Sequence, residues 1–250
     1  MKMKKHIPNM ITCCNLISGC IATYFAFQND FRLALLFIVI GAVFDFFDGM
    51  TARLLHVSSP IGKELDSLAD DITFGFAPSA IVFSFLQSHT AVADSSLFNL
   101  NSLLPYLAFI MAAFSALRLA KFNLDERQAM GFIGLPTPAN ALFWGSLIVG
   151  ITPQGTEHNL HNALCTMLNE QFIILPWVIQ LGTFISCYLL VSEIPMFALK
   201  FKTWGWKGNE VKYVFLLTCI PLLLLFGISG LAAIIAWYIL LSVINAKWQA

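Results

Sequence analysis

A succession of long apolar segments constrains the fold of this chain more than any other feature of its sequence. The hydrocarbon core of a bilayer is about 30 Å thick, so a helix needs about 20 mostly apolar residues to cross it. Of the 250 residues, 58% are hydrophobic and 11% are charged, whereas soluble domains carry about 25% charged residues. We therefore predict an all-α, polytopic transmembrane bundle. Its eight spans are expected at about 9–28, 33–54, 65–87, 103–122, 138–153, 172–195, 211–228 and 230–247.

The charges in the loops predict how these spans are oriented. Cytoplasmic loops of membrane proteins are rich in Lys and Arg. The loops at 88–102 and 154–171 contain neither, and of the 14 Lys and Arg residues only Arg32 lies on their side. We therefore expect both termini and the basic loops to face the cytoplasm. The absence of an organellar signal fits a bacterial inner membrane. The net charge of zero gives no support for nucleic-acid binding.

One stretch departs from the apolar pattern: DFFDGMTARLLHVSSPIGKELDSLAD, from Asp45 to Asp70. At about 100° per residue, one face of the second span carries two acids, one base and two small residues: Asp45, Asp48, Arg53, Gly49 and Ala52. After a short link broken by Pro60, a second stripe contains Gly62, Asp66 and Asp70. Two helices joined by so short a link can pack antiparallel, so the two acidic faces can meet.

Four carboxylates in a low-dielectric pocket repel one another and need cations. One arginine cannot neutralise four acids, whereas divalent cations can. Carboxylate oxygens favour Mg²⁺, Mn²⁺ or Ca²⁺ over zinc or copper, and paired metals often support phosphoryl transfer. The small residues would leave room for a phosphate or nucleotide, and Arg53 could hold a phosphate oxygen. Structural ion pairing and a proton or cation relay in a transporter are the alternative interpretations.

The spacing of these residues matches D-x2-D-G-x2-A-R-x8-G-x3-D-x3-D at all eight fixed positions. This pattern resembles the motif of the CDP-alcohol phosphotransferases, which are integral membrane enzymes of phospholipid synthesis. The resemblance runs from about residue 7 to 145. It implies one integral membrane domain over 1–250, with a catalytic core at about 7–145 and C-terminal spans at about 172–247. It also implies a homodimer.

The resemblance implies a role for each residue of the motif. Two divalent cations, Mg²⁺ or Mn²⁺, would be bound by Asp45, Asp48, Asp66 and Asp70. The CDP moiety of CDP-diacylglycerol would be bound by Asp48, Gly49, Ala52, Arg53, Gly62 and Asp66. Asp70 would be the general base for the acceptor hydroxyl, and Arg53 would help to balance the charge of the departing CMP. Asn9 and Asn15 in the first span either contact the nucleotide or are ordinary polar residues of a helix start.

Within the family, LDSLADDITFGFAP, RLAKFN and GFIGLPTPA are similar to the bacterial branch that uses L-serine as acceptor. Free serine needs at least one cation for its carboxylate, so we expect Arg118, Lys121 and Asn123 to bind the serine carboxylate or the lipid phosphate. The alternative is that these residues only anchor the fourth span on the cytoplasmic side. Lys121 stands where this branch usually has Arg, which keeps the charge but loses the planar fork. A glycerol 3-phosphate, inositol or inositol phosphate acceptor stays open, because Arg118 and Lys121 could also bind a phosphate.

Overall fold

The computed structural model describes residues 6–57, 59–90, 100–125, 132–152, 175–197, 205 and 209–249, and within them the chain is almost entirely helical. Its α-helices are α1 (His6–Phe27), α2 (Phe31–Leu54), α3 (Pro60–Asp70), α4 (Ala77–Thr90), α5 (Leu100–Leu103), α6 (Ile110–Leu124), α7 (Thr137–Ile151), α9 (Leu175–Val191), α10 (Glu210–Phe226) and α11 (Gly230–Gln249). A π-helical turn η2 (Asp71–Phe76), 3₁₀ turns η3 (Pro105–Phe109) and η5 (Gly227–Ser229), and strands β1 (Phe132–Ile133) and β2 (Pro195–Met196) complete the described elements.

Each of the eight predicted spans overlaps a helix of the described residues, but these helices do not all qualify as membrane spans. Five segments in the described part of the chain are long and apolar enough to cross a bilayer: His6–Phe27, Phe31–Leu54, Pro60–His89, Pro105–Leu124 and Glu210–Ala246. Helices α7 and α9 are apolar but shorter. The last segment contains both α10 and α11. The chain is therefore an integral membrane protein of helical class, while the count of eight spans and the location of the termini stay predictions.

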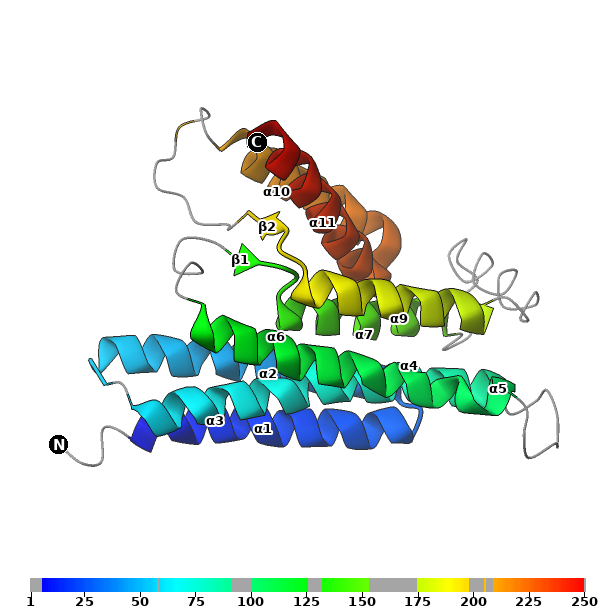
Figure 1. Ribbon diagram of the computed structural model, residues 1–250, viewed down its shortest axis with the longest axis horizontal. Coiled ribbons are helices and arrows are strands. Elements are labelled where there is room, and N and C mark those ends of the chain that lie inside the picture. The colour runs from blue at the N-terminus through cyan, green and yellow to red at the C-terminus, as the bar shows by residue number, and fades with distance from the viewer. Residues whose placement is uncertain are drawn as a thin grey trace.

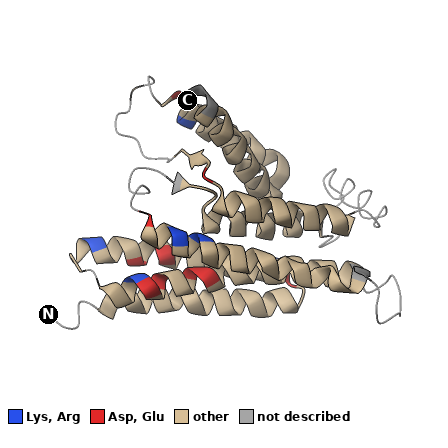
Figure 2. Cartoon of the chain, viewed as in Figure 1, with Lys and Arg blue, Asp and Glu red and all other residues tan. Residues whose placement is uncertain are grey.

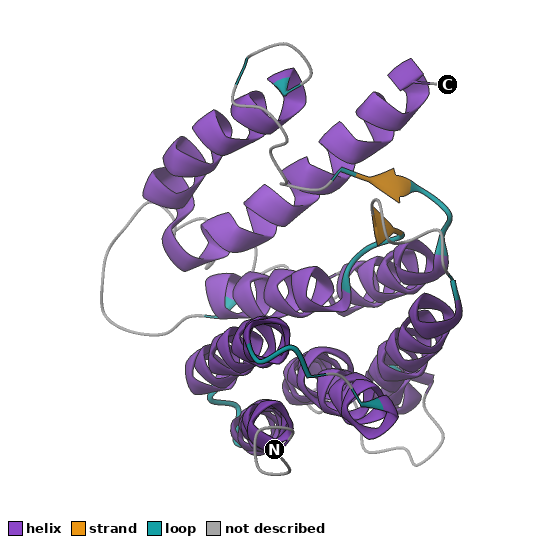
Figure 3. Cartoon of the chain, turned by 90° about the vertical axis from the view of Figure 1, so that its left-hand side faces the viewer, coloured by secondary structure: helices purple, strands orange, loops and turns teal. Residues whose placement is uncertain are grey.

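The helices form layers. Helices α1, α2, α3, α4 and α6 run along the long axis of the molecule, α7 and α9 lie on them, and α10 and α11 cross at an angle (Figure 1). Figure 3 looks along the bundle, so the lower helices appear end-on and the helix that ends at the C-terminus crosses above them. Helix α1 packs along α2 and also contacts α3 and α4. The core is centred on α4, with Phe74, Phe85 and Trp144 among its largest fully buried side chains.

Local sequence signals fix where α2 and α3 begin, on either side of a short link, and both helices pack against α1. Asp30 caps α2, because its Oδ1 accepts a hydrogen bond of 3.0 Å from the backbone N–H of Leu33. Ser59 caps α3 in the same way, through a 3.0 Å bond from the N–H of Gly62. Pro60 follows at the first helical position, where its missing N–H costs nothing. In the link, His56 adopts a left-handed backbone conformation, with φ of 52°.

Most charged residues of the lower bundle lie at one end, where α2 ends, α3 begins and α6 ends (Figure 2). Immediately after Asp70, helix α3 passes into the π-helical turn η2, and such turns occur frequently at functional sites. The acidic stretch therefore lies at one end of the apolar bundle, as the sequence predicts. Several basic residues that support the predicted orientation, including Lys4 and Arg127, lie outside the described residues.

Candidate active site

Three carboxylates from two helices meet at this end of the bundle. Asp45 and Asp48 come from α2 and Asp66 from α3, and one oxygen of each lies within 4.8 Å of the others. Asp48 is buried, and Asp45 and Asp66 are half-buried. One oxygen of Asp66 is buried without a hydrogen-bond partner in the described part of the chain. The two acidic faces therefore meet as predicted, although α2 and α3 pack mainly against α1 rather than against each other.

Asp70 lies one turn further along α3 and adjoins this trio. Its carboxyl group is within hydrogen-bonding range of Asp45, and it also interacts electrostatically with Asp66 and Asp48. Its Oδ1 accepts a 3.0 Å hydrogen bond from Nδ2 of Asn15 in α1. The four predicted acids thus converge, but only three of them offer oxygens to the close group.

Helix α1 holds two of these acids in place. The hydroxyl of Thr12 donates a 2.6 Å hydrogen bond to Oδ2 of Asp48, and its oxygen lies 3.1 Å from the carbonyl of Pro8. Asn15 is fully buried and donates to Asp70, and the hydroxyl of Thr73 donates a 3.0 Å bond to the Asn15 carbonyl. The sequence singles out Asn15, although not for this contact. It gives no signal for Thr12, which looks like an ordinary residue of an apolar span.

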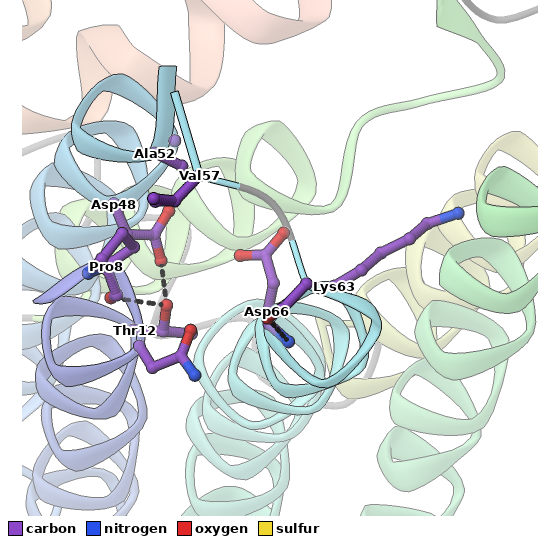
Figure 4. A pocket seen from close by; sticks show the side chains of 11 residues that line it. Pro8, Thr12, Asp48, Ala52, Val57, Lys63 and Asp66 are labelled. Atoms are coloured by element: carbon purple, nitrogen blue, oxygen red, sulfur yellow. Dashed lines mark hydrogen bonds between the residues drawn. The ribbon is translucent and has the colours of Figure 1, made fainter. Parts of the chain in front are cut away.

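A pocket of about 230 Å³ opens beside the trio. Figure 4 shows the carboxylates of Asp48 and Asp66 facing each other across it from α2 and α3, with Lys63 pointing away. Its walls include Asn9 of α1 and three small residues, Gly49, Ala52 and Gly62. A Cβ on Gly62 would lie 3.0 Å from Oγ of Ser59 and 3.1 Å from Oδ1 of Asn9, so a side chain there would crowd the pocket wall.

Arg53 lies next to this pocket rather than in its wall. Its side chain is exposed, and its Nε donates a 3.0 Å hydrogen bond to the carbonyl of Gly49, one turn earlier in α2. That bond fixes the start of the guanidinium group beside a residue that lines the pocket. The remaining N–H groups of an arginine can still bind a phosphate.

The three residues predicted for serine lie at the end of α6, but only Arg118 and Lys121 line a common pocket. Arg118 is buried, interacts electrostatically with Asp70 and lies 5.3 Å from the centre of the Phe122 ring. Lys121 is exposed. Asn123 instead ties α6 to α3, because its Nδ2 donates a 2.8 Å bond to Ser67 and its carbonyl accepts a 2.9 Å bond from Lys63.

The trio has the chemistry of a site for hard divalent cations. All its ligands are carboxylate oxygens, which Mg²⁺, Mn²⁺ and Ca²⁺ prefer. Three acids so close together, one of them buried, would be costly without a positive charge. The buried, unpartnered oxygen of Asp66 is a further position that a cation would satisfy. The residues present therefore fit the metal that the motif implies.

Together, a membrane-embedded helical bundle and a carboxylate trio beside a small-residue pocket define a class of metal-dependent membrane enzyme. The family model of the CDP-alcohol phosphatidyltransferases matches residues 5–180, and the chain belongs to this family.

Several curated relatives carry the name CDP-diacylglycerol–serine O-phosphatidyltransferase. The protein from Bacillus subtilis is 34% identical over 189 residues, which cover 76% of this chain and 88% of the relative. The protein from Methanocaldococcus jannaschii is 32% identical over 200 residues, covering 77% and 87%. The protein from Helicobacter pylori is 27% identical over 242 residues, covering 95% and 90%.

Proposed function

We propose that this chain is a CDP-diacylglycerol–serine O-phosphatidyltransferase, which transfers the phosphatidyl group of CDP-diacylglycerol to the hydroxyl of L-serine and releases CMP. The observation that carries the proposal is the convergence of Asp45, Asp48 and Asp66 beside a pocket lined by Gly49, Ala52 and Gly62. The shared name of relatives that cover most of both chains supports serine as the acceptor.

The pocket of about 230 Å³ would bind the CDP end of the donor. Its small residues let a nucleotide and its phosphates approach the backbone closely. Asp48 and Asp66 line its inner side, and Arg53, held on the Gly49 carbonyl, is placed to bind a phosphate oxygen at its edge. The acyl chains would remain in the bilayer beside the bundle.

Asp45, Asp48, Asp66 and Asp70 would hold two divalent cations, Mg²⁺ or Mn²⁺. When bound, these cations would supply positive charge against the pyrophosphate and polarise the phosphorus that is attacked. The contribution of the chain itself is to fix the oxygens: Thr12 orients Asp48, and Asn15 orients Asp70.

Asp70 would act as the general base. It would take the proton of the serine hydroxyl as the serine oxygen forms a bond to the phosphorus that carries diacylglycerol. The bond between that phosphorus and the CMP oxygen breaks, and CMP leaves with its negative charge near Arg53. Buried Arg118 of α6 interacts electrostatically with Asp70, so the chain places a cation on the side of the proposed base.

We further propose that the chain works as a homodimer and as one domain over residues 1–250. It would lie in a bacterial inner membrane, with its active site facing the cytoplasm. The distribution of Lys and Arg in the loops supports this orientation. A cytoplasmic site is also the side on which water-soluble serine and CMP would be exchanged.

The test is acceptor-dependent CMP release by the full chain in detergent micelles, with CDP-diacylglycerol and Mg²⁺ or Mn²⁺. We expect release with L-serine and none with glycerol 3-phosphate, with inositol or without an acceptor. Chelation of the metal should abolish release, and readdition should restore it. Asp70→Asn should lower kcat by about 100-fold or more, as loss of a general base does.

The alternatives give different results in the same assay. Release that depends on another acceptor would retain the family and reject serine. Full activity of Asp70→Asn would reject Asp70 as the base. No CMP release with any acceptor, by protein that is monodisperse and binds Mn²⁺, would reject the proposed reaction.

A further inference from the structure

A second pocket, of about 420 Å³, lies beside the end of α6. Its walls come from α6, from β1 and from the end of α9 with the residues that follow it. Among the described residues, none lines both this pocket and the donor pocket. Arg118 lines the second pocket and interacts electrostatically with Asp70, which adjoins the carboxylate trio.

The backbone holds the wall of this pocket in place. Strand β1 pairs with β2, and the N–H groups of Gly134 and Leu135 donate 2.9 Å hydrogen bonds to the carbonyls of Ile194 and Leu189. Gly134 has a φ of +75°, and a Cβ there would lie 2.8 Å from the carbonyl oxygen of Leu190. Glycine therefore allows the chain after α6 to lie directly against the end of α9 (Figure 1).

The pocket is lined by charges of both signs. Arg118 and Lys121 supply two cations from α6. Asp125, which caps the end of α6, and Glu193, two residues after the end of α9, supply two anions. Arg118 is only 7% exposed, and its Nε has no hydrogen-bond partner in the described part of the chain. A buried guanidinium with an unsatisfied N–H calls for a ligand with an acceptor oxygen.

We propose that this pocket binds the acceptor as a zwitterion: Arg118 and Lys121 bind its carboxylate, and Asp125 and Glu193 bind its ammonium group. The inference rests on the proposed function and specifies how that function selects an amino acid. Because Arg118 also interacts with Asp70, a carboxylate held by Arg118 places the rest of a small amino acid near the base.

The two acids account for selectivity among the possible acceptors. Glycerol 3-phosphate and inositol phosphate could use the two cations, but they carry no positive group and would meet the two carboxylates with like charge. Glu193 also lies beyond residue 180, where the match to the family model ends. A selective residue outside the region shared with the family would let related enzymes keep the donor site and use different acceptors.

Three acceptors test separately the two cations and the two acids of the pocket. They are L-serine, 3-hydroxypropanoate, which lacks the ammonium group, and ethanolamine, which lacks the carboxylate. CMP release is followed in the full chain with CDP-diacylglycerol and Mn²⁺, with each analogue used as acceptor and as competitive inhibitor of the serine reaction. In the double variant Asp125→Asn and Glu193→Gln, we expect the KM for serine to rise about tenfold or more. Its kcat should change by less than about twofold, because Asp125 and Glu193 bind the ammonium group but take no part in the chemistry.

The same variant should bind 3-hydroxypropanoate at least as well as the unmodified chain does. Lys121→Gln should weaken serine and 3-hydroxypropanoate together and leave ethanolamine unchanged. Glu210→Gln is the matched control, because Glu210 lies at the exposed start of α10 and in neither pocket. It should leave the affinities for serine, 3-hydroxypropanoate and ethanolamine unchanged.

The outcomes separate this inference from the proposed function. If the unmodified chain uses serine but the double variant keeps its KM for serine, Asp125 and Glu193 do not bind the ammonium group. The proposed function would then still stand. An equal loss of affinity for serine and 3-hydroxypropanoate in the double variant would also overturn the proposal. If the unmodified chain releases no CMP with serine, the proposed function fails first.

Discussion

At the scale of single residues, the site depends on polar side chains that a membrane helix would not otherwise carry. Thr12 and Asn15 are buried in α1, and each donates a hydrogen bond to a carboxylate of another helix. Mutation of residues that orient metal ligands typically lowers metal affinity or activity by about 10- to 100-fold. Helix α1 therefore belongs to the site although it provides none of the four predicted ligands.

Thr12→Val tests this role of α1. Valine has almost the same shape but cannot donate to Asp48, so the carboxylate loses its orientation while the packing remains. We expect the Mn²⁺ or Mg²⁺ concentration for half-maximal CMP release to rise about 10- to 100-fold. Saturating metal should restore most of the rate. Thr12→Ser keeps the hydroxyl and should stay near the unmodified value; equal metal dependence in all three proteins would refute the orienting role.

At the scale of elements, small residues set how closely the helices approach one another. A Cβ on Gly41 of α2 would lie 2.5 Å from Cγ2 of Thr73 in η2 and 2.9 Å from Oδ1 of Asn15 in α1. Gly49, two turns later in α2, is different: among the described residues, a Cβ there would meet only Arg53, at 3.9 Å. One glycine therefore permits packing between three elements, and the other leaves space beside a pocket.

Gly41→Ala and Gly49→Ala form a matched pair. Gly41→Ala should destabilise the fold by about 1–3 kcal/mol, because overpacking outweighs the better helix propensity of alanine. Gly49→Ala should keep or slightly raise the thermal unfolding temperature in micelles but raise the KM for CDP-diacylglycerol. The unfolding temperature and the KM, measured for both variants, show which glycine serves packing and which serves donor binding. A stable Gly41→Ala protein would show that the junction of α1, α2 and η2 can relax.

The elements that sequence reasoning finds are those with a strong local signal. Apolar length predicts the helices, and the spacing of Asp45, Asp48, Asp66 and Asp70 predicts the acidic site at the end of α2 and in α3. The turn η2 and the two-residue strands β1 and β2 are missed, because they are short and depend on tertiary contacts. Thr12 is missed for the same reason: its partner Asp48 is 36 residues away, and no periodic pattern marks it.

At the scale of the whole molecule, the α10–α11 region decides how many times the chain crosses the membrane. By length and composition, Glu210–Ala246 is one apolar segment of 37 residues. It is nevertheless interrupted at Gly227, whose φ is +57°, by the turn η5. Helices α10 and α11 pack against each other on either side of that turn. Two packed helices joined by a tight turn form a hairpin, which enters and leaves the membrane on the same side.

A hairpin at α10–α11, with α7 and α9 crossing as well, gives eight spans and places both termini on one side. The chain carrying one epitope tag at each end is tested in oriented inner-membrane vesicles with an impermeant protease. We expect both tags to be cut only when the cytoplasmic face is outside, because the basic loops should face the cytoplasm. Cleavage of the two tags from opposite faces would mean an odd number of crossings. It would require either that α10 and α11 cross once together or that one of the short helices α7 and α9 does not span.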